Sequence, residues 1–188
     1  RQRQMCIRDR DRTILRDHYD PPLSPYNYTS PLSGMRSYIT NSKDDVLLTV
    51  ENLPAGSSVR LAVMDRFDGN VWNLSDSTMS SDSSNYRRVG TSITNSAEGK
   101  KFTATFTVDK GLSDYWLPMA GAASSVTFDN SENSDSFYYN SDTMSAIYPS
   151  RTSEGLTYTE TGIMPMVPTD KQIAKTDAVS YTHLRAHE

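Results

Sequence analysis

Cysteine and histidine, on which most nucleophilic catalysis depends, are scarce in this sequence. Cys6 is the only cysteine among 188 residues, and His18 is the only histidine outside the last ten positions. A Ser-His or Cys-His pair would therefore have to use His18. This histidine is followed closely by Pro21 and Pro22, and a solvated or packed side chain explains it better than catalysis. The sequence predicts no catalytic residues.

Paired carboxylates are the next chemistry to consider. Asp65 and Asp68 lie close together in the sequence, but each has a structural explanation. Asp65 ends a predicted strand, and Asp68 precedes Gly69 in a predicted turn. Acid–base catalysis would also need a cleft that raises one of the two pKa values. A small β-fold hydrolase remains open only if the two carboxylates face each other in a pocket.

The segment from Asp129 to Asp135 carries oxygen-bearing side chains at alternate positions, as a calcium-binding loop of the EF-hand type does at its start. However, Ser134 stands at the sixth position in place of glycine, and Asn140 stands at the twelfth in place of a bidentate glutamate. An exposed hairpin loop is therefore the preferred interpretation. We predict no metal site and no cofactor.

Aromatic residues fall within most of the predicted strands, and they suggest two roles. On one sheet face they could form a stacking platform for sugars; inside the fold they would supply core and cross-strand pairs. We favour the second role and expect Trp72, if it is a core residue, to contribute about 3–5 kcal/mol. The residues concerned are Trp72, Trp116, Tyr138, Tyr139, Tyr148 and Tyr158.

Hydrophobic alternation predicts the elements that would position these residues. Residues 59–72 are typical of a hairpin, with a strand, a turn at Asp68-Gly69-Asn70 that needs φ > 0, and a return strand. Residues 102–108 show the clearest period of two in the chain. Shorter strands are expected at 46–50, 115–117, 125–128, 137–139, 144–148 and 156–161. Regularly spaced strands predict a mainly β, immunoglobulin-like or β-sandwich-like single domain.

The predicted domain boundaries follow changes in composition. Residues 11–40 contain four of the nine prolines together with Tyr26, Tyr28 and Tyr38, and are expected to form an extended strap that packs on the domain. Residues 41–168 form the predicted β-rich domain, with an exposed serine-rich loop at 75–85. Residues 169–178 are expected to begin a short helix or a linker to a missing domain. Residues 1–10 and 179–188 resemble translated sequencing-adapter read-through and are excluded from fold reasoning.

The charge balance argues against nucleic acid as a partner. Without the two terminal strings, the sequence has 14 Lys and Arg against 21 Asp and Glu, a net charge of −7. Nucleic-acid binding needs a basic surface that displaces counterions, and electrostatic docking on anionic lipid is disfavoured for the same reason.

Several segments together resemble one protein family. They are residues 12–23, 30–38, 60–72 and 115–118, among which Pro31-Leu-Ser-Gly34 and Asp65-Arg-Phe-Asp-Gly-Asn-Val-Trp72 are the more specific. This pattern is similar to bacterial, especially actinobacterial, transglutaminase-like membrane proteins of the TgpA type. Such a resemblance implies membrane spans, then an extracytoplasmic β-rich region, then a core with a Cys-His-Asp triad. None of the triad residues matches a position in this sequence. Five residues match positions that recur in the family, and we interpret them as structural: Asp65, Gly69, Trp72, Trp116 and Pro118.

The resemblance therefore implies a non-enzymatic module on the outer face of a bacterial plasma membrane. This module would position or gate the missing core, which would act on envelope proteins or peptides. Its partners would be the membrane and transglutaminase-like parts of the same protein. The alternative is a glycan- or protein-binding module of the cell surface, which coplanar, exposed aromatic rings would favour.

Overall fold

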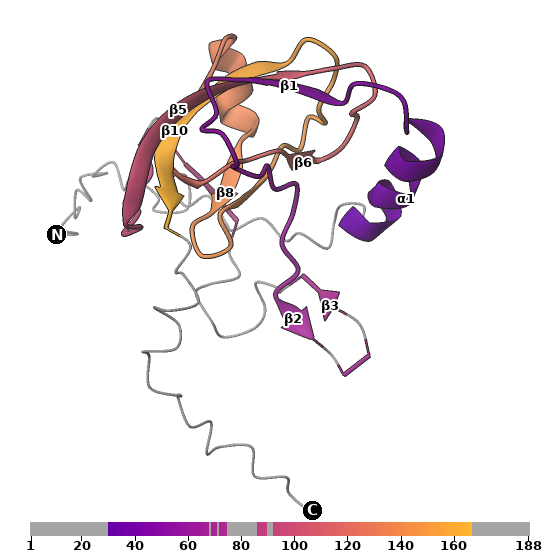
Figure 1. Cartoon of the computed structure of the whole chain (residues 1–188), viewed down its shortest axis with the longest axis horizontal. Helices are drawn as coiled ribbons and strands as arrows, with labels where there is room; N and C mark the ends of the chain where they lie inside the picture. Colours follow the sequence, from indigo (N-terminus) through magenta and orange to yellow (C-terminus); the bar gives the residue numbers. More distant parts are fainter. Residues whose placement is uncertain (1–29, 68, 71, 75–85, 90–91, 167–188) are drawn as a thin grey trace, which may run out of the picture.

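The computed structural model describes residues 30–67, 69–70, 72–74, 86–89 and 92–166. These residues form two four-stranded antiparallel sheets, a separate two-stranded hairpin, one α-helix and one 3₁₀-helix (Figure 1). The prediction of a mainly β, sandwich-like fold is confirmed. None of the helices in this part of the chain is long and apolar enough to cross a membrane.

The first sheet has the order β1-β5-β10-β7, with bounds Leu48–Glu51, Gly99–Val108, Thr157–Pro165 and Ala122–Phe128. The alternation predicted for residues 102–108 is confirmed: Phe102, Ala104, Phe106 and Val108 are all buried. The threonines between them face outward and meet threonines of β10, as in the pair Thr105 and Thr159, whose hydroxyl oxygens are 3.2 Å apart. One face of this sheet therefore builds the core and the other is polar.

The second sheet has the order β4-β8-β9-β6, with bounds Arg87–Arg88, Tyr138–Asn140, Ser145–Ile147 and Trp116–Leu117. Tyrosine hydroxyls join it to the first sheet. Tyr158 of β10 donates a hydrogen bond to the carbonyl of Pro118 at 2.6 Å, and Tyr139 of β8 accepts one from the amide of Ala123 at 3.1 Å. Both bonds are buried, so they fix the register of one sheet on the other.

Aromatic side chains fill the space between the sheets. Phe106 and Tyr158 stack with centroids 5.1 Å apart, and Phe128 contacts the rings of Phe137, Tyr148 and Tyr158. Pairs of this kind stabilise a fold beyond the area that they bury. The expectation that aromatic residues are used mainly for packing is therefore correct for the core.

The hairpin is shorter than predicted. Strands β2 (Arg66–Phe67) and β3 (Trp72–Asn73) pair only with each other, and Gly69 adopts the expected positive φ of 104°. The strand predicted to begin at Val59 is wrong, because between Val59 and β2 only Arg60 makes a bridge, to Met119. Figure 1 shows the hairpin projecting away from the sheets.

Helix α1 (Pro31–Asn41) contradicts the prediction of an extended segment up to residue 40. Proline is tolerated at the first position of a helix, where its missing N–H has no intrahelical partner, so Pro31 opens this helix rather than preventing it. Residues 11–29, the loop at 75–85 and the helix predicted at 169–175 lie outside the described residues.

Candidate functional site

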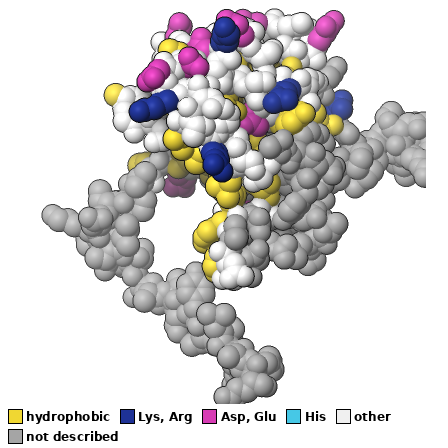
Figure 2. Space-filling model, turned by 90° about the vertical axis from the view of Figure 1, so that its right-hand side faces the viewer, with side chains coloured by type: hydrophobic (Ala, Val, Ile, Leu, Met, Phe, Trp, Pro, Cys, Tyr) yellow, Lys and Arg dark blue, Asp and Glu magenta, His cyan; other side chains and the backbone are white. Residues whose placement is uncertain are grey.

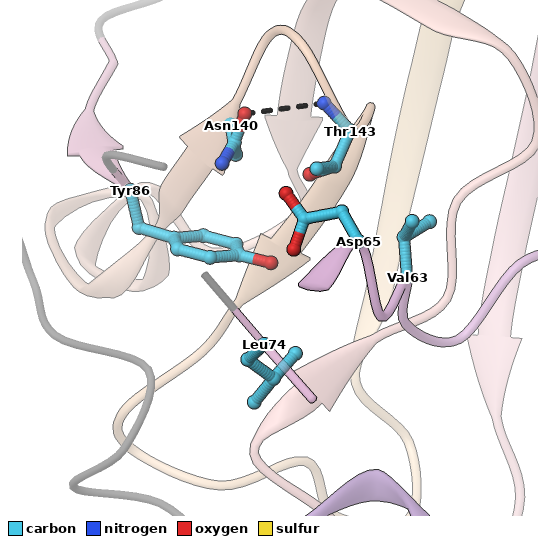
Figure 3. A pocket seen from close by; sticks show the side chains of 6 residues that line it. All are labelled: Val63, Asp65, Leu74, Tyr86, Asn140 and Thr143. Atoms are coloured by element: carbon cyan, nitrogen blue, oxygen red, sulfur yellow. Dashed lines mark hydrogen bonds between the residues drawn. The ribbon is translucent and has the colours of Figure 1, made fainter. Parts of the chain in front are cut away.

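Asp65 lies in a small crevice between the hairpin and the second sheet (Figure 3). Its carboxylate points toward the hydroxyl of Tyr86 and the side chain of Thr143. Burial raises the pKa of Tyr86, and the charge of Asp65 adds to this effect. The crevice is too narrow to hold a water molecule. The full lining is Val63, Asp65, Leu74, Tyr86, Asn140 and Thr143.

The polar contacts of this crevice stabilise the turn between β8 and β9. The side-chain oxygen of Asn140 accepts hydrogen bonds from the amides of Asp142 and Thr143, at 3.0 and 3.2 Å. The Tyr86 hydroxyl bonds to that of Ser145 at 2.6 Å. Asp68, the other half of the proposed carboxylate pair, lies outside the described residues. Asp65 itself is exposed, and the crevice beside it has no room for a substrate.

The six aromatic residues considered for a sugar platform do not share a surface. Trp116, Tyr139, Tyr148 and Tyr158 are buried, and Tyr138 is half-buried beneath the guanidinium of Arg88. Trp72 is 56 % exposed, so its interpretation as a core residue is wrong. The physical reason is that, among the described strands, β2 and β3 pair only with each other, and neither of the two larger sheets extends over their rings.

Phe67 is a surface residue that the sequence analysis missed. It lies opposite Trp72 in the hairpin, is 54 % exposed, and has its ring centroid 5.3 Å from that of Trp72. The register of the predicted turn could have indicated this pair. The two planes are inclined by 40°, so the rings do not form the coplanar surface expected of a sugar platform.

The segment considered for calcium overlaps the 3₁₀-helix η4 (Ser131–Ser136). The side chain of Asn130 caps this helix by accepting a hydrogen bond from the amide of Glu132 at 3.1 Å. An EF-hand loop instead directs alternate side chains toward one ion. Among the residues that the structure describes, no three His, Cys, Asp or Glu side chains are arranged to hold a metal ion.

Glu160 is a second residue that the sequence analysis missed. It is completely buried in β10, where its two carboxylate oxygens accept hydrogen bonds from the amides of Ala120 at 2.8 Å and Gly121 at 3.2 Å. Desolvation raises its pKa to about 7, against the opposing effects of the two amides and of Arg60. Its inward position between Thr159 and Thr161 follows from the strand alternation.

A hollow of about 580 Å³ lies at the end of the first sheet, where Arg60 and Lys100 are its charged lining residues. Arg60 is partly engaged, because its guanidinium donates to the carbonyl of Met144 at 2.7 Å. Both oxygens of nearby Glu160 already accept backbone amides. The hollow thus contains cationic groups, but the carboxylate next to it is committed to the fold.

A polar joint attaches helix α1 to the sandwich. The hydroxyl of Tyr38 donates to Oδ2 of Asp114 at 2.7 Å, while Oδ1 of Asp114 accepts the amides of Tyr115 and Trp116. Gly34 approaches so closely that an added Cβ would lie 2.9 Å from Oδ2 of Asp114. The joint therefore connects α1 to the first residues of β6.

A family model for the TgpA N-terminal domain matches residues 29–166. This chain belongs to that family. The resemblance to transglutaminase-like proteins of the TgpA type is thereby confirmed. No curated protein and no solved structure gives a match.

The matched region of this TgpA N-terminal domain begins just before α1 and ends just after β10. Helix α1 is thus part of the region that defines the family. The description of the family names the N-terminal domain and not the transglutaminase core. This supports the interpretation of the chain as an accessory, non-catalytic part of a transglutaminase-like protein.

Proposed function

We propose that this TgpA N-terminal domain is an extracytoplasmic module of a membrane-bound transglutaminase-like protein. In this role it positions or gates a Cys-His-Asp core elsewhere in the same protein, and that core acts on envelope proteins or peptides. The module contributes geometry and no reacting group.

The observation that carries the proposal is that the first and last elements of the domain, α1 and β10, are both attached to the sandwich. Helix α1 is held by Tyr38 on Asp114, and β10 pairs along its whole length with β5. Segments joined to these two ends would keep a defined distance and orientation, because the sandwich between them is packed and cross-linked by buried hydrogen bonds. A free linker would not have this property.

The test uses the complete protein that contains this domain. Tyr38→Phe removes the hydrogen bond of the joint, and Ser33→Ala, at an exposed position of α1, is the matched control. We expect Y38F to change the rate at which an amine is incorporated into a glutamine-containing protein, while S33A keeps the wild-type rate. Unchanged rates in Y38F and in a protein lacking the whole domain would contradict the proposal.

A protein-binding module of the cell surface is the second candidate, favoured by the exposed Phe67 and Trp72 pair. Aromatic residues on a projecting element are typical of the centres of protein interfaces. The tilt of the two rings and the burial of the other aromatic residues favour protein over glycan.

A further inference from the structure

The hollow of about 580 Å³ lies where β5 begins and β10 ends (Figure 1). A further wall is the turn at residues 54–58, which a hydrogen bond from the amide of Ser57 to the carbonyl of Pro54 closes at 3.1 Å. Gly56 adopts a positive φ of 81° in this turn. The hollow has the size of sites that bind small molecules, which enclose roughly 300–1,000 Å³.

Strand alternation places a lysine on the inner side of β5 at this end. The alternation that buries Phe102 and Ala104 continues to Lys100, which is exposed and lines the hollow. Its partner in register on β10 is Met164, which lines the hollow as well. The hollow is therefore a continuation of the space between the sheets that opens to solvent, with a cation in the row where the core has apolar residues.

Both charged residues of the lining are cationic. Within the described ranges, Arg60 makes one side-chain hydrogen bond, to the carbonyl of Met144, and neither Arg60 nor Lys100 makes an ion pair. Glu98, two residues before Lys100, does not line the hollow. Glu160 is completely buried and uses both carboxylate oxygens to accept backbone amides. The cations of the hollow are thus not paired with a carboxylate of the described residues.

This arrangement differs from the distribution of charges elsewhere on the surface. Figure 2 shows one face of the molecule, on which Lys and Arg side chains lie singly and Asp and Glu side chains gather along the upper edge. The chain as a whole has 23 Asp and Glu against 19 Lys and Arg. In a chain with an excess of acidic residues, a hollow lined by two cations and no anion attracts anionic ligands.

The uncharged part of the lining indicates what the anion is attached to. Ala120, Met164 and Pro165 contribute apolar atoms, and Ser57 and Ser58 contribute hydroxyl groups. A bare inorganic anion would leave the apolar atoms in contact with water, whereas an organic acid covers them. Arginine and lysine bind a carboxylate through charge-assisted hydrogen bonds, and serine hydroxyls can pair with the polar groups of a peptide backbone. The combination fits a carboxylate on a short apolar peptide.

We propose that this hollow binds the carboxylate of a short apolar peptide. Arg60 and Lys100 hold the carboxylate, and Met164 and Pro165 contact the neighbouring apolar side chain of the peptide. The carboxylate belongs either to the C-terminus of the peptide or to an acidic side chain within it. The inference goes beyond the proposed function, because it requires neither a bilayer nor a catalytic core and gives the domain a ligand of its own.

Isothermal titration calorimetry of the full chain provides the test. The probes are three peptides: acetyl-Leu-Ala-Leu with a free C-terminal carboxylate, its C-terminal amide, and the C-terminal amide of acetyl-Leu-Ala-Glu. At least one of the two carboxylate peptides should bind, and the neutral amide should bind about tenfold more weakly. Tighter binding of the first peptide assigns the carboxylate to a chain terminus, and tighter binding of the third assigns it to an acidic side chain.

Lys100→Gln should weaken the binding of the carboxylate peptide about tenfold, because it removes one of the two cations. Lys101→Gln is the matched control, since it removes the same charge from the next residue, which lies on the outer side of β5 and does not line the hollow. Lys100→Arg should retain binding. Because Lys100 is exposed, K100Q should unfold at the same urea concentration as wild type.

A wild-type chain that binds neither carboxylate peptide would overturn the inference. Equal weakening in K100Q and K101Q would also overturn it, because the effect would then reflect net charge alone. The same holds if inorganic phosphate binds as tightly as the peptides, since the apolar lining would then contribute nothing. None of these measurements involves the incorporation of an amine, so failure of this inference is distinguishable from failure of the proposed function.

Discussion

At the level of single residues, Glu160 links the stability of the domain to pH. Its folded-state pKa of about 7 lies above the ordinary value of 4.5, so the folded protein holds a proton that the unfolded chain has released. The stabilisation that Glu160 gives the folded state is fully present below about pH 4.5 and is lost as the pH rises through 7. The corresponding change in the free energy of unfolding is on the order of 3 kcal/mol. Urea unfolding at pH 5 and pH 8 should show the folded state to be more stable at pH 5.

Glu160→Gln is the matched variant for this effect. Its side-chain oxygen can still accept an amide, but it has no proton to release between these two pH values. The difference in unfolding free energy between pH 5 and pH 8 should therefore shrink in E160Q. If wild type and E160Q change equally with pH, another group controls the pH dependence.

The two tryptophans should differ sharply in their contribution to stability. Trp116 is fully buried and packs edge-on against Tyr86, with centroids 6.0 Å apart. Trp116→Ala should cost about 3–5 kcal/mol, because it leaves a cavity in the core. Trp72→Ala, at a site more than half exposed, should cost less than about 1 kcal/mol. Thermal or urea unfolding measures the loss of stability in both variants. Equal losses would show that Trp72 is covered by other parts of the protein.

At the level of elements, α1 is attached by the hydrogen bond from Tyr38 to the carboxylate of Asp114 and by the packing of the Tyr38 ring against the core. Burial raises the pKa of the Tyr38 hydroxyl, and the bond to Asp114 adds to this effect. Tyr38→Phe should weaken the attachment by about 1–2 kcal/mol. Hydrogen exchange should then become faster in α1 and stay unchanged in β5 and β10. Equal acceleration in all three elements would indicate global destabilisation.

Gly34 provides an independent test of the same joint. Alanine is the better helix former by about 1 kcal/mol, so Gly34→Ala would stabilise a helix that was free of the body. Here the new Cβ would lie 2.9 Å from Oδ2 of Asp114, and we expect faster exchange in α1 instead. Ser33→Ala, at an exposed position, is the control. Slower exchange in G34A would mean that α1 does not rest on Asp114.

At the level of the whole molecule, the two sheets should unfold together. Core residues from both sheets form one cluster, and the Tyr158–Pro118 and Tyr139–Ala123 hydrogen bonds connect them. Breaking one sheet would leave the inner face of the other in water. Far-ultraviolet circular dichroism and tryptophan fluorescence should therefore report one coincident transition in urea. Separate midpoints would mean that the sheets are independent units.

The sequence by itself determined those features that depend on neighbours along the chain. Alternation at residues 102–108 predicted the buried face of β5, and Gly69 predicted the turn, because a period of two and a positive φ are local properties. The same alternation, applied at Glu160, would have placed this carboxylate inside the fold. The prolines misled the prediction for α1, since Pro31 occupies the one helical position that needs no donor.

Only the tertiary structure decided which side chains meet and which remain uncovered. Trp72 and Trp116 both lie in predicted strands, yet one projects into solvent and the other is enclosed, because coverage depends on a second sheet contributed by distant segments. Likewise, Tyr38 and Asp114 are 76 residues apart, and Glu160 meets amides 39 and 40 residues away. Such contacts arise from packing, on which local patterns carry no information.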